Sequence, residues 1–105
     1  MYETMNRLII EWATERGIFK HGNPAMQAQK TLEEVEELIE AIAEQDEHEI
    51  IDAIGDIYVT LVIQAEMHGV SMIKCINQVY DEIKDRQGRM VGGMFVKDIP
   101  KDYAE

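Results

Sequence analysis

Acidic side chains are concentrated in the middle of the chain, at spacings that place several of them on one face of a helix. Glu34 and Glu37 are three residues apart, so on a helix both project from the same side. Glu49, Asp52 and Asp56 share a helical face in the same way further along the chain. Two facing helices could bring such carboxylates together, where they would repel one another and raise one another's pKa values. A hard divalent cation such as magnesium or manganese would relieve that repulsion.

Asp56 is the most informative of these acids, because it directly precedes the segment 57–65, which is apolar on nearly every side. A carboxylate buried beside such a segment is costly unless it is paired or bound to a metal. Periodicity alone also fits an ordinary solvated face, since glutamate is a good helix former. A metal site and a non-catalytic acidic surface that binds a partner protein are therefore both open at this point.

The elements that must position these acids are four helices, predicted at about residues 2–16, 25–44, 48–68 and 71–85 from apolar residues at helical spacing. Residues 18–24 are expected to form a loop, because Gly-Asn-Pro marks a turn and Pro24 suits the start of the next helix. Glycines after residue 87 predict a turn with short extended pieces. We therefore expect a single all-α domain over residues 1–105 with a short non-helical tail.

The third predicted helix indicates self-association. A helix that is apolar all round must be buried all round. Four helices in a chain of 105 residues can hardly surround the segment 57–65, so we expect a second copy of the chain to cover it. Val62, in the middle of this segment, is expected to lie in that interface.

The two acidic segments resemble those of the MazG-like nucleotide pyrophosphohydrolases, whose pattern is Glu-Glu-x-x-Glu on one helix and Glu-x-x-Asp on the next. The matching segments are Leu32-Glu33-Glu34-Val35-Glu36-Glu37-Leu38 and Glu49-Ile50-Ile51-Asp52-Ala53-Ile54-Gly55-Asp56. The resemblance covers about residues 18–97, and the form Asp-Ala-Ile-Gly-Asp looks like short members from bacteriophages. It implies a four-helix bundle completed as a homodimer or homotetramer with shared nucleotide pockets. It also implies magnesium-dependent hydrolysis of (deoxy)nucleoside triphosphates to nucleoside monophosphate and pyrophosphate.

The second half of the pattern departs from the family. Ala53 stands where an acid is expected three residues before Asp56, whereas Glu49 and Asp52 match the spacing one turn earlier. The second half of the site therefore stays open between these acids. The metal ligands that the resemblance implies are Glu34, Glu37, Glu49, Asp52 and Asp56, and the acids that could orient or deprotonate water are Glu33, Glu34 and Glu37.

Several basic and amide side chains could bind the substrate. Cations late in an acidic chain could contact phosphate oxygens that the metal leaves free, or could simply offset acid on the neighbouring surface. Asn23 and Gln27 could recognise a base or sugar, or could be a loop cap and a surface residue. Trp12 and Phe19 could stack on a base, although core packing is the commoner role of such residues. The predicted substrate-binding residues are Lys30, Lys84, Arg86, Arg89, Lys97, Asn23 and Gln27.

Composition excludes several other classes of function. The net charge of −11 repels a phosphate backbone, so we expect no nucleic-acid partner. No apolar run reaches the length of about 18 residues that a membrane helix needs, and no secretory signal is visible, so a cytoplasmic location is expected. A helical di-iron site needs Glu-x-x-His, but Gln45 and Ala65 stand three residues before His48 and His68.

Overall fold

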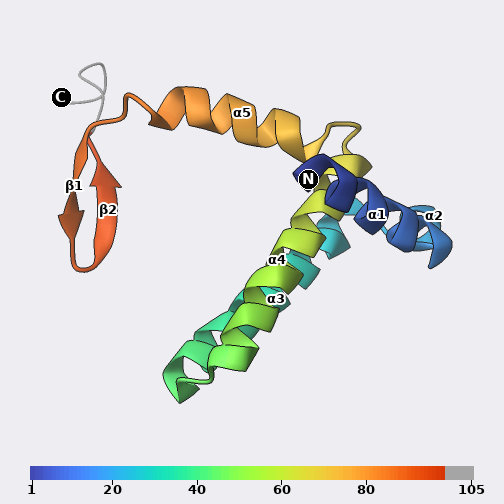
Figure 1. The fold of residues 1–105 in the computed structure, drawn as a ribbon, viewed down its shortest axis with the longest axis horizontal. Coiled ribbons are helices and arrows are strands. Elements are labelled where there is room, and N and C mark those ends of the chain that lie inside the picture. Colours follow the sequence, from blue (N-terminus) through green and yellow to red (C-terminus); the bar gives the residue numbers. More distant parts are fainter. Residues whose placement is uncertain (99–105) are drawn as a thin grey trace. The chain divides into compact units, whose positions relative to one another are not determined.

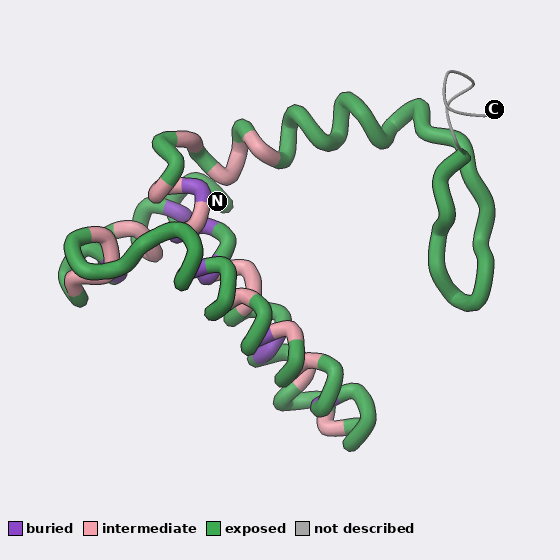
Figure 2. The backbone as a smooth tube through the Cα atoms, turned by 180° about the vertical axis from the view of Figure 1, so that it is seen from behind, coloured by how far each residue is buried: buried purple, intermediate pink, exposed green. Residues whose placement is uncertain are grey.

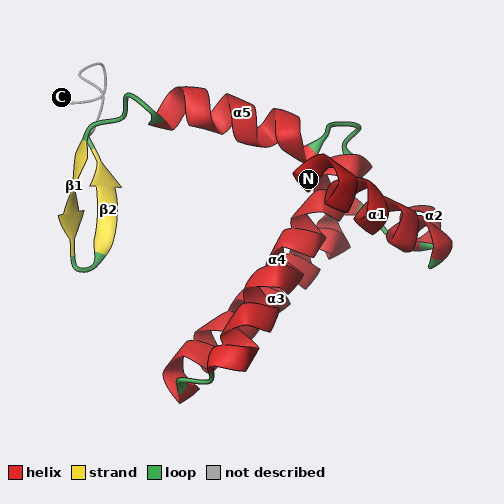
Figure 3. Ribbon diagram, viewed as in Figure 1, coloured by secondary structure: helices red, strands yellow, loops and turns green. Residues whose placement is uncertain are grey.

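The structure is a computed structural model that describes residues 1–98. Figures 1 and 3 show its helices and its one pair of strands in the described part. Contacts divide the chain into two units, Met1–Cys75 and the part from Ile76 onward. The elements are α1 (Tyr2–Glu15), α2 (Ile18–His21), α3 (Pro24–Glu44), α4 (Glu47–Met67), α5 (Met72–Ile83), β1 (Gly88–Val91) and β2 (Met94–Lys97).

Helices α3 and α4 form an antiparallel hairpin, which is the main packing of the first unit (Figure 1). Asn23 begins α3, and its side-chain oxygen accepts the N–H of Met26 at 2.9 Å. Asp46 begins α4 and accepts the N–H of Glu49 at 3.1 Å in the same way. These caps satisfy amide groups that a helix start otherwise leaves without partners, and they explain why both helices begin where they do.

The all-α fold class is confirmed, and the predicted limits of the long helices agree with the structure to within two residues. The expected loop at residues 18–24 is wrong in part, because Ile18–His21 forms the short helix α2. Gly17, with a φ of 76°, lets the chain turn out of α1. The N–H of Gly22 then closes the single turn by donating to the carbonyl of Ile18 at 2.8 Å.

The core of the first unit consists largely of small side chains. Its buried apolar residues are Ala13, Ala41, Ala53, Val62, Ile63 and Ala65. Val62 is 2% exposed in one copy of the chain, so the expectation that it lies in an interface is wrong. It lies on the side of α4 that meets α1, where it borders one hollow together with Asn6, Ile10 and Val70.

Apolar side chains that one copy leaves exposed lie mostly outside the segment 57–65. Figure 2 shows the exposed stretches that separate the buried residues of the α3–α4 hairpin. Within 57–65 the chain covers most side chains itself, and Leu61 is the exposed large apolar residue. Exposed apolar residues recur at helical spacing on each helix of the hairpin, namely Leu32, Ile39 and Ile42 on α3 and Ile51, Ile54 and Leu61 on α4.

The second unit contains the antiparallel hairpin of β1 and β2, with Gly88 opposite Lys97 and Val91 opposite Met94. Gly92 and Gly93 connect the strands with φ values of 57° and 83°. Such positive angles at both central residues suit a tight hairpin turn and favour glycine. The predicted turn with short extended pieces is therefore confirmed. Among residues 1–98, no helix is both long enough and apolar enough to cross a bilayer.

Candidate metal site

Three of the predicted metal ligands meet between the two helices of the hairpin. Glu34 and Glu37 of α3 and Asp56 of α4 each offer a carboxylate oxygen, and these oxygens lie within 4.8 Å of one another. The two glutamates share a face because they are separated by about one helical turn. The antiparallel packing of α4 brings the aspartate to the same level. We call these three residues the acid cluster.

Glu34 is the buried member of the acid cluster, with a side chain that is 9% exposed. Its Oε1 lies 3.4 Å from Nζ of Lys30. Its Oε2 is buried and has no hydrogen-bond partner among the described residues. An ionised oxygen without a partner is costly in such a place. The residues therefore fit a hard divalent cation, which prefers carboxylate oxygens and would supply the missing partner.

Asp56 lies at the exposed side of the acid cluster. Partial loss of solvent raises the pKa of its carboxyl first, the negative charges of Glu34 and Asp52 raise it further, and Lys30 opposes the shift. The sequence pattern singled out Asp56 as the costly buried acid, but the structure buries Glu34 instead. In one copy of the chain, the apolar segment that follows Asp56 does not cover its carboxylate.

Lys30 links the acid cluster to Glu33. Its Nζ is 3.3 Å from Oε2 of Glu33 and 3.4 Å from Oε1 of Glu34. Hydrogen bonds to Glu33 and then to Glu34 raise the pKa of Lys30, so its ammonium stays charged. Glu33 is exposed and engaged by this ammonium, whereas Glu37 is exposed within the cluster.

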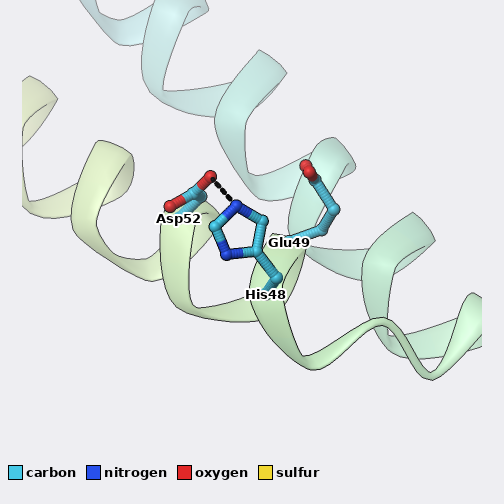
Figure 4. A group of neighbouring side chains, drawn as sticks. All are labelled: His48, Glu49 and Asp52. Carbon is cyan, nitrogen blue, oxygen red and sulfur yellow. Dashed lines mark ion pairs between the residues drawn. The ribbon is translucent and has the colours of Figure 1, made fainter.

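Glu49 and Asp52 belong to a separate group with His48 on the first turns of α4. Nε2 of His48 lies 3.5 Å from Oδ2 of Asp52, and Figure 4 shows the imidazole turned toward Asp52 with Glu49 to one side. All three side chains are exposed. Asp52 precedes Asp56 by about one turn, so it lies nearer the α3–α4 connection than the acid cluster does. The five predicted ligands are thus divided between two groups. His48 was missed as a member, although its spacing of four from Asp52 was a signal.

A cavity of about 220 Å³ borders the acid cluster within the first unit. Lys30, Glu34 and Asp56 form its charged wall, and Trp12, Ile18 and Val59 supply apolar surface. The guanidinium of Arg16 lies 4.7 Å from the centre of the Trp12 ring, a cation–π contact on one face of the indole. The cavity therefore combines charge at one side with an apolar wall at the other, a common composition of ligand pockets.

Two of the predicted substrate-binding residues take part in helix structure. Asn23 caps α3 through its side-chain oxygen. Gln27 is buried, and its Nε2 donates to the carbonyl oxygen of Thr60 at 3.1 Å. The alternative interpretation of Gln27, as a surface residue with no role in substrate binding, is therefore wrong, because the side chain is buried.

Four predicted phosphate-binding residues, Lys84, Arg86, Arg89 and Lys97, lie in the second unit and are exposed. Nζ of Lys84 is 3.5 Å from Oδ1 of Asp81. Arg89 lies opposite Val96 in the strand pair. Because neighbouring residues of a strand point to opposite faces, Arg89 and Lys97 project from opposite faces of the hairpin.

Comparison with known proteins identifies the central part of the chain. The family model of the MazG nucleotide pyrophosphohydrolase domain matches residues 23–91. No curated protein and no solved structure gives a significant match. The matched segment runs from the cap of α3 to the end of β1, so it contains the acid cluster and Lys30.

Proposed function

Because the chain belongs to the MazG nucleotide pyrophosphohydrolase family, we propose that it hydrolyses nucleoside or deoxynucleoside triphosphates to the monophosphate and pyrophosphate. The observation that carries this proposal is the buried carboxylate of Glu34, whose Oε2 lacks a partner among the described residues. It lies within a cluster of acids beside a cavity. Such a site suits a ligand that arrives as a complex of phosphate and cation.

The cation in this proposal is Mg²⁺, with Mn²⁺ as a substitute. Glu34, Glu37 and Asp56 would hold it, because their oxygens already converge. Glu49 and Asp52 are additional candidates on the neighbouring turns of α4. When bound, the cation neutralises charge on the phosphates and orients them.

The side chains around the acid cluster would perform the remaining steps. Lys30 keeps its charge and lines the cavity, where it can contact a phosphate oxygen. Glu33 or Glu37 would orient a water molecule and accept its proton. The water oxygen bonds to the α-phosphorus. The bond from the α-phosphorus to the oxygen that bridges the α- and β-phosphates then breaks, and pyrophosphate leaves with that oxygen. Lys84, Arg86, Arg89 and Lys97 are proposed to contact phosphates, whereas the bonds of Asn23 and Gln27 favour structural roles.

A homodimer or homotetramer is part of the proposal. Each helix of the α3–α4 hairpin carries exposed apolar side chains at helical spacing, among them Ile39 at 61% and Ile54 at 56% exposure. Apolar side chains that recur on one face of a helix suit burial against another surface. A second copy of the chain is the occupant that we propose for this face.

An assay of products tests the proposed function. Purified chain with millimolar magnesium and a panel of natural and modified triphosphates is expected to release pyrophosphate and the matching monophosphate. Glu34→Gln should abolish release, whereas Glu40→Gln, a change at an exposed glutamate outside the acid cluster, should not. Orthophosphate as the first product would refute the assignment. Absence of turnover with every triphosphate would favour a non-catalytic acidic interaction module.

A further inference from the structure

We propose that Gln27, Thr31 and Thr60 are positioning residues that set the register of α3 against α4 and thereby bring Glu34 and Asp56 together. They form an uncharged hydrogen-bonded layer between the two helices, which we call the polar layer. This inference rests on the proposed function, because it assigns the polar layer to the geometry of the metal site.

The polar layer is continuous, with Gln27 and Thr60 buried and Thr31 half-buried. The Nε2 of Gln27 donates to the carbonyl oxygen of Thr60 at 3.1 Å, and the hydroxyl of Thr31 donates to the hydroxyl oxygen of Thr60 at 2.9 Å. The hydroxyl of Thr60 in turn donates to the carbonyl of Ile57 at 2.7 Å. Gln27 and Thr60 are 9% and 5% exposed. Because the hydroxyl proton of Thr60 is engaged within α4, its oxygen is the acceptor in the contact with Thr31 of α3.

The polar layer is adjacent to the acid cluster along both helices. Thr31 precedes Glu34 by three residues on α3, and Thr60 follows Asp56 by four on α4. Each spacing is about one helical turn, or roughly 5 Å along the axis. Since the helices are antiparallel, these two steps run in the same direction in space. Aligning Thr31 with Thr60 therefore aligns Glu34 with Asp56.

Apolar packing and the short connection also restrain the hairpin, since Ile63 of α4 is 3% exposed at this level, but apolar contacts carry no directional bonds. Ala41 and Ala53 are its fully buried apolar contacts toward the α3–α4 connection, each 4% exposed. Methyl groups do not interlock as larger side chains do, so they discriminate weakly between registers. A buried polar residue is a well-attested means of selecting one register, because any shift leaves a buried polar group without its partner. The acids themselves cannot serve this purpose, since they repel one another without a cation.

A positioning role can be separated from a stabilising one. Replacing both partners of a buried hydrogen bond by apolar residues of the same shape can leave stability nearly unchanged. The double variant Thr31→Val/Thr60→Val therefore removes the directional hydrogen bond between the two side chains while it keeps their volume. If the polar layer positions the acids, metal affinity falls although the chain stays folded.

The experiment measures Mn²⁺ binding by electron paramagnetic resonance of the free ion, together with thermal unfolding in EDTA. We expect Thr31→Val/Thr60→Val to bind Mn²⁺ about 10- to 100-fold more weakly, the range seen when partners of metal ligands are removed. Gln27→Met, which breaks the second contact, should act in the same direction. Thr60→Ser keeps the hydroxyl and should bind like the wild type. Thr14→Val is the matched control, because the Thr14 hydroxyl donates to Ile10 of its own helix at 2.7 Å.

Wild-type Mn²⁺ affinity in the double variant would overturn the inference. The inference would also be overturned if Thr60→Ser weakened Mn²⁺ binding as the double variant does and both variants lost melting temperature to match. That pattern would show general destabilisation. A wild-type chain that binds no Mn²⁺ would refute the proposed metal site and this inference together. A third outcome separates the two ideas. If the wild type binds Mn²⁺ but hydrolyses no triphosphate, and the double variant binds Mn²⁺ more weakly, the proposed function is refuted and the positioning role stands.

Discussion

Lys30 and Glu34 lie about one turn apart on α3, with Nζ of the lysine 3.4 Å from Oε1 of the glutamate. The other oxygen of the same carboxylate, Oε2, is buried and has no partner among the described residues. One oxygen of the carboxylate thus meets the chain's own cation, and the other is left without a partner. The ion pair with Lys30 offsets part of the cost of a carboxylate that is 9% exposed, and in the proposed site the second oxygen would bind the metal.

Divalent cations should stabilise the fold, because a cation that joins the acid cluster binds the folded chain and not the unfolded one. At ten times its dissociation constant, Mg²⁺ is expected to add about 1.4 kcal/mol, a rise of about 5 to 10 °C in melting temperature. Scanning fluorimetry with and without EDTA measures this shift. Glu34→Gln and Asp56→Asn should abolish it, and Glu40→Gln should retain it. A wild-type melting curve that ignores millimolar Mg²⁺ and Mn²⁺ would rule out the site.

Replacing Lys30 by Gln should lower the melting temperature of the metal-free chain but enlarge the rise that magnesium produces. Without the ammonium, the buried carboxylate of Glu34 loses a counter-charge, so the metal-free melting temperature is expected to fall. The magnesium-induced rise should then increase, because the cation no longer competes with Lys30. Arg7→Gln is the control, since Arg7 forms an exposed pair with Glu11 and such pairs contribute little. An unchanged magnesium shift in Lys30→Gln would argue against that competition.

The raised pKa of Asp56 predicts a pH-dependent cost in the metal-free chain. Because the folded chain binds this proton more tightly than the unfolded chain, stability is gained as the pH falls through the raised pKa toward the ordinary value of 3.8. At neutral pH, Asp56→Asn should therefore melt higher than the wild type in EDTA. The difference should disappear in acid, where both chains are neutral at this position. Melting curves over that pH range test the sign, with the exposed Asp85→Asn as control.

Self-association is expected to depend on the exposed apolar residues of the hairpin. Light scattering at micromolar concentration should give a dimer or a larger species for the wild type. Ile54→Glu, at a side chain that is 56% exposed, should shift the mass toward the monomer without unfolding it. Met26→Glu is the control, because Met26 is similarly exposed but lies off the row of Leu32, Ile39 and Ile42 on α3. A wild-type mass of one chain would contradict the proposed assembly.

Local signals were sufficient for most of the fold. Asn23-Pro24 marks the start of α3, Asp46 the start of α4, and Ser71 accepts the N–H of Lys74 at 3.1 Å at the start of α5. Each of these caps acts within a few residues, so the start of the helix can be predicted from the sequence without knowledge of the fold. Helix α2 escaped prediction because one turn between two glycines has too few residues for a periodic pattern.

The site could be predicted only in part, because it depends on the register of two helices. Helical spacing places Glu34 with Glu37, but it does not say which acid of α4 faces them. The structure brings Asp56 to that position and leaves Asp52 beside His48. The polar layer also went unnoticed, because threonines within helices carry no distinctive pattern until both helices are seen together.

Since Gln45 and Asp46 alone join α3 to α4, closing the hairpin requires little chain entropy, and such local contacts form quickly during folding. We therefore expect Glu34 and Asp56 to approach each other early, while much of the chain is still open. Their mutual repulsion opposes this step, and the hydroxyl contact between Thr31 and Thr60 favours it. If the acid cluster binds a divalent cation as proposed, we expect that cation to speed folding of the chain as well as to stabilise the folded molecule.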